Sequence, residues 1–95
     1  MEFTIPDHHP ALAGHFPERP IVPAVVILDA VLALLPRFDP ARRASGIVSA
    51  KFTAVLLPGQ PCRVAFAPRD EGSLRFTCES GGQRIASGIL GLSPR

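Results

Sequence analysis

An apolar run over residues 24–35 constrains the fold of this chain more than any other feature, because it is long, almost unbroken and bounded by prolines. Asp29 is its only charged residue, and Pro23 precedes it in a position that suits the first turn of a helix. The run is well short of the roughly 20 apolar residues that span a bilayer. We therefore predict a helix from Ala24 to about Arg37 that is apolar on nearly every face and hence surrounded by protein.

Other patterns flank this helix. Residues 2–5 are typical of a short strand, and residues 7–23 form a proline-rich loop of the stiff kind that often carries a site. Pro36 and Pro40 are expected to stop the helix.

From Gly46 onward, apolar and polar residues alternate, which predicts strands separated by turns at 57–60, 70–73 and 80–83. One face of the first of these strands would carry Val48, Ala50, Phe52 and Ala54. A strand, one helix and then an antiparallel meander predict a single α+β domain over residues 1–95.

Composition limits the classes of partner. An apolar fraction of 46% is high for 95 residues and favours self-association. Ten basic and eight acidic residues give a net charge of only +2, the basic residues are scattered, and Tyr and Trp are absent. The sequence therefore predicts no nucleic-acid binding, whereas an acidic carrier protein remains a possible partner.

The remaining sequence features predict neither metal nor export. Cys62 and Cys78 lie outside any CxxC motif, and His8, His9 and His15 match no common zinc spacing, so we expect no metal and no disulfide framework. The N-terminus shows neither the basic nor the apolar region of a signal peptide, so a cytoplasmic location is expected, with no membrane contact.

Two residues stand out as candidates for acid–base chemistry. Asp29 has only apolar neighbours three and four positions away on the predicted helix, and burial favours the protonated carboxyl that a general acid needs. Alternatively, Asp29 lies at a subunit seam or an exposed edge. His15 lies in the stiff loop, and its imidazole can accept a proton near neutral pH. A loop histidine is, however, more often a surface residue.

The segment from Gly14 to Asp29, GHFPERPIVPAVVILD, resembles the signature of the β-hydroxyacyl-acyl carrier protein dehydratase family, the hot-dog dehydratases of fatty-acid synthesis. The fourteen-residue spacing from His15 to Asp29 is that of the family. The segment from Lys51 to Gly59 is similar to the family's second strand and its Pro-Gly turn, so the resemblance covers most of the chain.

This resemblance implies a hot-dog fold, in which an antiparallel sheet wraps around a central helix, and a homodimer or higher homo-oligomer with its active sites between subunits. His15 would remove the α-proton of a 3-hydroxyacyl thioester carried by acyl carrier protein or coenzyme A. Asp29 of the other subunit, or a water that it orients, would protonate the departing hydroxyl, leaving a 2-enoyl thioester without any cofactor. The backbone N–H of Ala24 would polarise the thioester carbonyl. The other substrate-binding residues implied are Phe16, Pro23, Val25, Leu28 and Phe52.

The sequence departs from the family pattern at Ala24, where Gly is usual, at Ala33, where Gln is common, and in its short length. The family branch with Asp at the position of Asp29 also isomerises the double bond, an activity that we do not assign. The segment Pro6–Pro10 makes the chain similar to small dehydratase-like proteins of aryl-polyene pathways. The alternative functions are a non-catalytic hot-dog protein that binds acyl thioesters or a carrier protein, and a thioesterase, against which the spacing from His15 to Asp29 argues.

Overall fold

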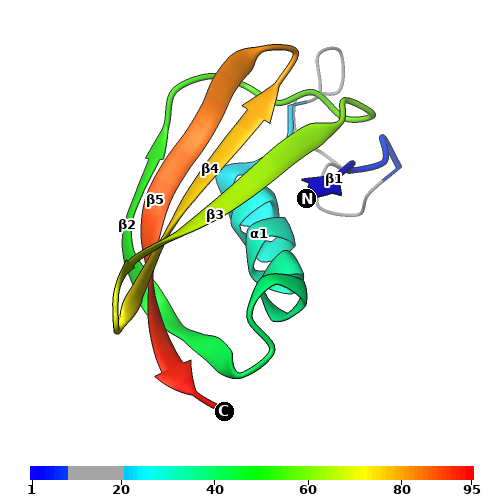
Figure 1. Cartoon of the computed structure of the whole chain (residues 1–95). Helices are drawn as coiled ribbons and strands as arrows, with labels where there is room; N and C mark the ends of the chain where they lie inside the picture. Colours follow the sequence, from blue (N-terminus) through cyan, green and yellow to red (C-terminus); the bar gives the residue numbers. More distant parts are fainter. Residues whose placement is uncertain (9–20) are drawn as a thin grey trace.

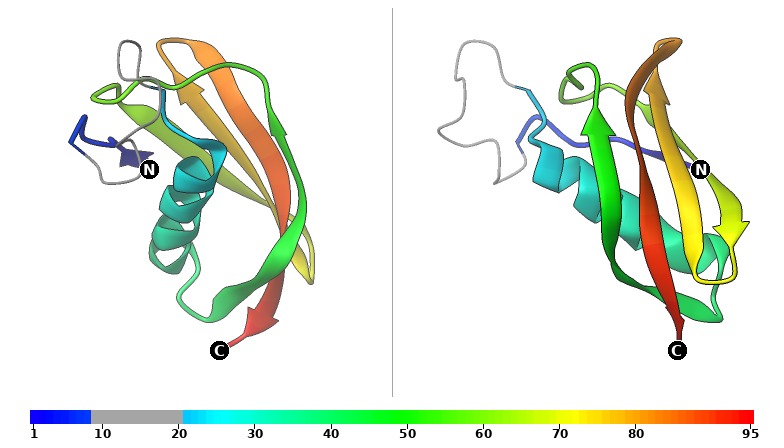
Figure 2. Two further views of the ribbon diagram at one scale, coloured as in Figure 1. Left: turned by 180° about the vertical axis from the view of Figure 1, so that it is seen from behind. Right: turned by 90° about the vertical axis from the view of Figure 1, so that its left-hand side faces the viewer.

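The alternating segments of the sequence pair into one curved antiparallel sheet, and the apolar run forms a helix against its concave side (Figures 1 and 2). The structure, a computed structural model, describes residues 1–8 and 21–95. Its elements in chain order are β1 (Glu2–Phe3), α1 (Ala24–Phe38), β2 (Arg42–Phe52), β3 (Cys62–Asp70), β4 (Ser73–Ser80) and β5 (Gln83–Pro94). The predicted α+β architecture is confirmed.

The strand order differs from the predicted meander. Only β3, β4 and β5 follow one another in space, and the full order is β1-β3-β4-β5-β2. The segment 53–61 carries the chain from β2 across the end of the sheet to β3 (Figure 1). Three backbone hydrogen bonds hold this segment: Thr53 N–H donates to the Ile85 carbonyl at 2.9 Å, Val22 N–H donates to the Leu56 carbonyl at 2.8 Å, and Gly59 N–H donates to the Ile5 carbonyl at 2.8 Å. Strand β2 therefore pairs with the last strand instead of the next one.

The helix runs through one of the two prolines that were expected to stop it. Pro36 lies inside α1, and the Asp39 N–H still donates to the Leu35 carbonyl at 2.8 Å. Proline lacks an N–H for the carbonyl four residues earlier, but it leaves the following bonds intact. The last turn therefore closes after Pro36, and α1 ends at Phe38, before Pro40.

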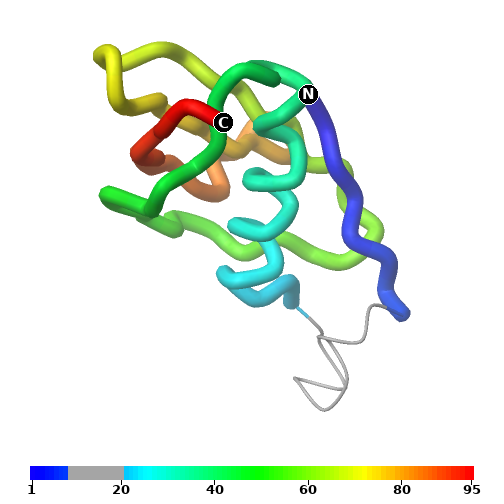
Figure 3. Tube along the Cα trace, turned by 90° about the horizontal axis from the view of Figure 1, so that it is seen from below, coloured from blue at the N-terminus to red at the C-terminus, as the bar shows by residue number. Residues whose placement is uncertain are grey.

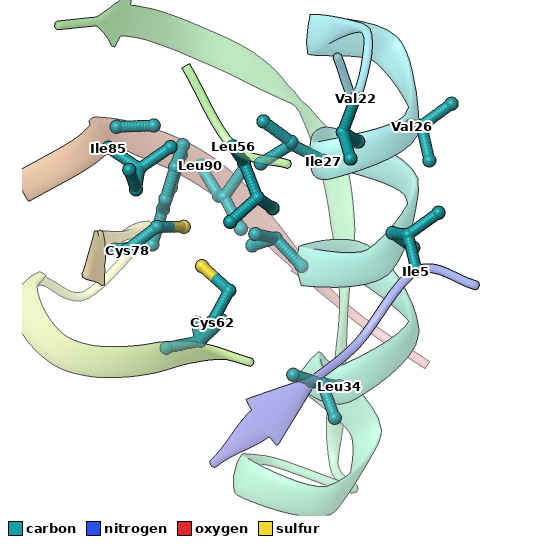
Figure 4. Close-up of a cluster of buried hydrophobic side chains, with 14 residues drawn as sticks. Ile5, Val22, Val26, Ile27, Leu34, Leu56, Cys62, Cys78, Ile85 and Leu90 are labelled. Carbon is teal, nitrogen blue, oxygen red and sulfur yellow. The ribbon is translucent and has the colours of Figure 1, made fainter. Parts of the chain in front are cut away.

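The core lies between one side of α1 and the inner face of the sheet. The helix contributes Val26, Ile27, Val31 and Leu34, and the largest fully buried side chain of the sheet is Phe76. The cross-section in Figure 4 shows the helix side chains meeting those of the strands. A second, smaller cluster of buried side chains consists of Leu35 from α1, Leu74 from β4 and Leu92 from β5.

The described residues of one chain do not surround α1 on all sides, which was predicted from its apolar sequence. Figures 1 and 3 show the N-terminal segment along one flank of α1 and β2 on the other flank. Within the described residues no element covers the side of α1 that faces away from the sheet, where Val25 is 62% exposed. An apolar helix face that one chain leaves open is the kind of surface that a second subunit covers.

Candidate active site

The N-terminus of α1 presents backbone donors without side-chain caps. Pro23 occupies the cap position with an extended backbone, and its carbonyl accepts hydrogen bonds from Val26 N–H at 3.0 Å and Ile27 N–H at 3.2 Å. The N–H groups of Ala24 and Val25 precede these bonds and have no acceptor within the helix. Among the described residues no side chain caps this end, and the first turn holds no acidic residue. The positive end of the helix dipole is thus available to a ligand carbonyl.

Asp29 lies at the middle of the open side of α1. Val25 and Ala33, one turn before and one turn after it, are both exposed, so the three form a stripe along the helix. Within residues 1–8 and 21–95 the Asp29 carboxylate makes no hydrogen bond or ion pair that would fix it. Of the two positions that the sequence left open for Asp29, a buried one and one at a subunit seam or exposed edge, the described residues agree with the second, because Asp29 is exposed on the helix face that points away from the sheet.

His15 and Phe16 lie outside the described residues, so the predicted acid–base pair is represented by Asp29 alone. The described substrate-binding candidates gather on two elements. Pro23, Ala24, Val25 and Leu28 belong to the start of α1, and Phe52 ends β2. The helix and β2 lie beside each other (Figure 2).

The inner face of β2 was only partly predicted. Phe52, Ala50 and Ile47 pair with Ala86, Gly88 and Leu90 of β5, whose side chains or Cα atoms are buried in the core layer. Residues directly opposite each other face the same side of a sheet, so these three residues of β2 face the helix. The predicted face with Val48 is wrong at that position, because a register shift between Ile47 and Ser49 places an extra residue there.

The three inward residues of β2 stay open to solvent although they face the helix layer. Phe52 is 37% exposed and Ile47 is 44% exposed, and Ala50 between them is exposed as well. On the helix, Val26 is buried in the same cluster as Ile5 of the N-terminal segment, and Leu28 and Leu32 are half-buried against this cluster. The exposure of these three inward-facing residues of β2 was missed at the level of sequence.

A concavity of the structure lies away from α1 and β2. It has a volume of about 460 Å³ and is lined by polar and turn residues, namely Glu2, Gln60, Pro61, Arg63, Glu79, Ser80, Gly81 and Gly82. None of the predicted site residues that the structure describes lines it. We therefore place the candidate chemistry at α1 and β2, where a backbone donor pair, a carboxylate and apolar side chains occur together.

The two cysteines belong to the core. Cys62 on β3 and Cys78 on β4 are both 0% exposed and unpaired, and their sulfur atoms point toward each other (Figure 4). Burial raises the pKa of the Cys62 thiol, and burial together with the charge of a Cys62 thiolate raises the pKa of Cys78 to about 12. Such thiols stay protonated and are poor nucleophiles. In the part of the chain that the structure describes, no three His, Cys, Asp or Glu residues cluster as a metal site would.

Comparison with known proteins identifies the family. The family model described as ApeI dehydratase matches residues 1–89. The chain belongs to the ApeI-like family. One similar structure is the dehydratase heterocomplex ApeI:P from Xenorhabdus doucetiae, with a TM-score of 0.79 and 26% identity over 99% of this chain and 84% of that one. No curated protein is significantly similar in sequence to this ApeI-like chain.

Two further structures share the fold. An uncharacterised protein from Erwinia carotovora subsp. atroseptica has a TM-score of 0.81 and 24% identity over 98% of this ApeI-like chain and 80% of its own. The fluoroacetyl-CoA thioesterase FlK has a TM-score of 0.62 and 20% identity over 99% of this chain and 83% of its own. The predicted hot-dog fold is thereby confirmed, and it is a fold that hosts both dehydratases and thioesterases. No described helix of the ApeI-like chain has the length and hydropathy to cross a membrane.

Proposed function

We propose that this chain is a 3-hydroxyacyl-thioester dehydratase that acts on a substrate carried by acyl carrier protein or coenzyme A in the cytoplasm, in fatty-acid or polyene synthesis. The observation that carries the proposal is the position of Asp29. It is an exposed carboxylate on the open, otherwise apolar side of α1, within two turns of the uncapped helix N-terminus, in a member of the ApeI-like family.

In the proposed reaction the Ala24 N–H donates a hydrogen bond to the thioester carbonyl, so that the negative charge that develops on this oxygen is stabilised by the helix dipole. The imidazole of His15 takes a proton from C2 of the substrate. Asp29 donates a proton to the hydroxyl on C3 as the C3–O bond breaks, and water leaves. The electrons of the C2–H bond form the new double bond. Phe16, Pro23, Val25, Leu28 and Phe52 would hold the substrate.

We propose further that residues 1–95 act as one domain and that two copies assemble, with His15 of one subunit facing Asp29 of the other. Strand β2 supports this assembly. It is the last strand of the sheet, it is eleven residues long, and its outer edge has no partner among the described residues. Long open strand edges readily pair with another strand. Since the relative from X. doucetiae is a dehydratase heterocomplex, a different subunit is the alternative partner.

The test is the appearance of the enoyl thioester by ultraviolet absorbance during incubation with 3-hydroxyacyl thioesters of several lengths. The wild type should turn over, and His15→Ala and Asp29→Asn should each lose at least about a hundredfold in rate. Glu71→Gln, which removes an exposed carboxylate from the turn between β3 and β4, is the matched control and should keep the wild-type rate. A folded wild type that binds acyl thioesters without converting them would support the non-catalytic alternative. Release of free thiol instead of an enoyl product would support the thioesterase.

A further inference from the structure

A row of alternating charge crosses four strands on the face of the sheet that points away from α1. Glu2 of β1 lies directly opposite Arg63 of β3. Arg63 in turn lies opposite Glu79 of β4, and Glu79 lies opposite Arg84 of β5. Residues directly opposite each other point to the same side of a sheet, all four are exposed, and Cys62 beside Arg63 is buried in the core. These four residues, which we call the charged row, therefore alternate acid and base across the outer face.

The charged row is only partly neutralised within one chain. The Arg84 guanidinium and the Glu79 carboxylate approach to 3.8 Å, and both side chains stay about half exposed. Among the described residues, neither Glu2 nor Arg63 has an opposite charge within ion-pair distance. Exposed charges of this kind remain hydrated and contribute little to the stability of a single chain. The row therefore keeps its charge available to a complementary surface.

One end of the charged row is hollow and the other is not. The concavity of about 460 Å³ is lined by Glu2 and the next two members of the row, whereas Arg84 is not among its lining residues. Its wall is fixed, because the Ser80 hydroxyl donates a hydrogen bond of 2.6 Å to the Pro61 carbonyl. The turn at 81–82 carries no side chains and leaves the hollow open. A preformed hollow with a carboxylate at its end fits a long basic side chain.

The charged row is complementary to itself. A two-fold axis that runs along the strands, between β3 and β4, reverses the order of the row in a second copy that faces the first. Glu2 then faces Arg84 of the second copy and Arg63 faces its Glu79, so each kind of ion pair forms twice. A two-fold axis across the strands would place like charges together, which is unfavourable. Charge therefore selects one orientation, in which Arg84 of the second copy enters the concavity beside Glu2.

We propose that the outer face of the sheet is an interface on which a second copy of this chain docks through the charged row. This interface does not involve α1 or the open edge of β2, so it adds to the assembly along β2 and joins two such pairs into four chains. It does not depend on the proposed reaction. Exposed ion pairs are individually weak and are screened by salt. The contact therefore forms at high protein concentration and low ionic strength, and it separates in dilute solution.

The experiment measures the mean mass in solution by sedimentation equilibrium, from micromolar to millimolar protein at low ionic strength. The mass of the wild type should rise about twofold over this range, and added salt should reverse the rise. Glu2→Arg and Arg84→Glu should each keep the dilute mass throughout, because either change places like charges opposite each other when a variant pairs with itself. Unchanged melting temperatures show that both variants are folded.

A mixture of the two variants tests the orientation. Position 2 of the Glu2→Arg variant then faces position 84 of the Arg84→Glu variant, and the unchanged Arg84 of the first faces the unchanged Glu2 of the second. Every pair has opposite charges again, so the equimolar mixture should regain the rise in mass that neither variant shows alone. No general effect of net charge predicts this recovery, because each variant alone carries only one of the two changes.

The matched controls are Glu71→Arg and Arg95→Glu, which make the same charge changes at exposed positions outside the charged row. Both should associate as the wild type does. Single variants of the row that associate like the wild type, or a mixture that stays at the dilute mass, overturn the inference. A wild type whose mass does not rise with concentration also overturns it and leaves the outer face to a different protein.

Discussion

At the scale of single residues, the close approach of β2, β5 and Phe76 depends on the missing side chain at Gly88. Gly46, in the same pair of strands, faces open space, with no atom within 4 Å of a Cβ built on it. Neither glycine has the positive φ that alone would disfavour a side chain. The two therefore differ in packing and hardly at all in backbone preference.

Gly88→Ala should destabilise the protein by about 1–3 kcal/mol, since its methyl group must displace the fully buried Phe76 ring or the Ser49 carbonyl. Gly46→Ala should be neutral or raise the free energy of unfolding by a few tenths of a kcal/mol, because the unfolded chain loses freedom. Urea denaturation of both variants measures the difference. Equal stabilities for the two variants would show that the contact at Gly88 relaxes without cost.

The Cys78 thiol should make stability depend on alkaline pH. Burial raises its pKa to about 12, from an unfolded value near 9.0. Above the unfolded value the unfolded chain releases this proton and the folded chain keeps it, so the free energy of unfolding falls as pH rises between these two values. The slope approaches about 1.4 kcal/mol per pH unit for one thiol. The free energy of unfolding, measured by urea titration at pH 8 and at pH 10, should fall more for the wild type than for Cys78→Val. An equal fall in the two proteins would refute the assignment of this pH dependence to Cys78.

At the scale of elements, the sequence predicts which segments form structure and leaves open which of them become neighbours. The start of α1 at Ala24 follows from Pro23, and the β4–β5 turn follows from Gly81 and Gly82, both of which adopt positive φ. Alternation states which residues share a face, but it contains nothing about the partner of a strand. The pairing of β2 with β5 therefore could not be predicted, and the register shift at Val48 was equally hidden.

Pro36 provides the prediction for the helix itself. Within α1 it leaves the carbonyl of Leu32 without its intrahelical donor and costs helical free energy that an alanine would not. Part of this cost is offset because proline also restricts the unfolded chain. Pro36→Ala should therefore raise the free energy of unfolding by about 1 kcal/mol, with a higher melting temperature in calorimetry. A lower melting temperature would mean that the helix end is strained in a way that proline relieves.

At the scale of the whole molecule, the candidate site is divided between what one chain holds and what a second chain would add. The apolar neighbours of Asp29 were visible in the sequence, but the spacing of apolar residues on a helix does not state which subunit covers them. The exposure of Asp29, Val25 and the inner face of β2 among the described residues therefore could not be predicted from the sequence. Helix α1 supplies the carboxylate and strand β2 supplies exposed apolar side chains, and the described part of one chain leaves both open.

If two copies pair along β2, charge placed on that strand should separate them. Val48 is 64% exposed at the register shift of β2, and a lysine there would be buried against the other subunit without a partner, at a cost of several kcal/mol. Analytical ultracentrifugation should give two chains for the wild type and one for Val48→Lys, with dehydratase activity lost in the same variant, because His15 and Asp29 then no longer meet. Ala65→Lys places the same charge on the outer face of the sheet and should remain dimeric and active. A monomeric wild type that turns over substrate, or a Val48→Lys variant that stays dimeric, would exclude pairing through β2 and require both groups of the site to come from one chain.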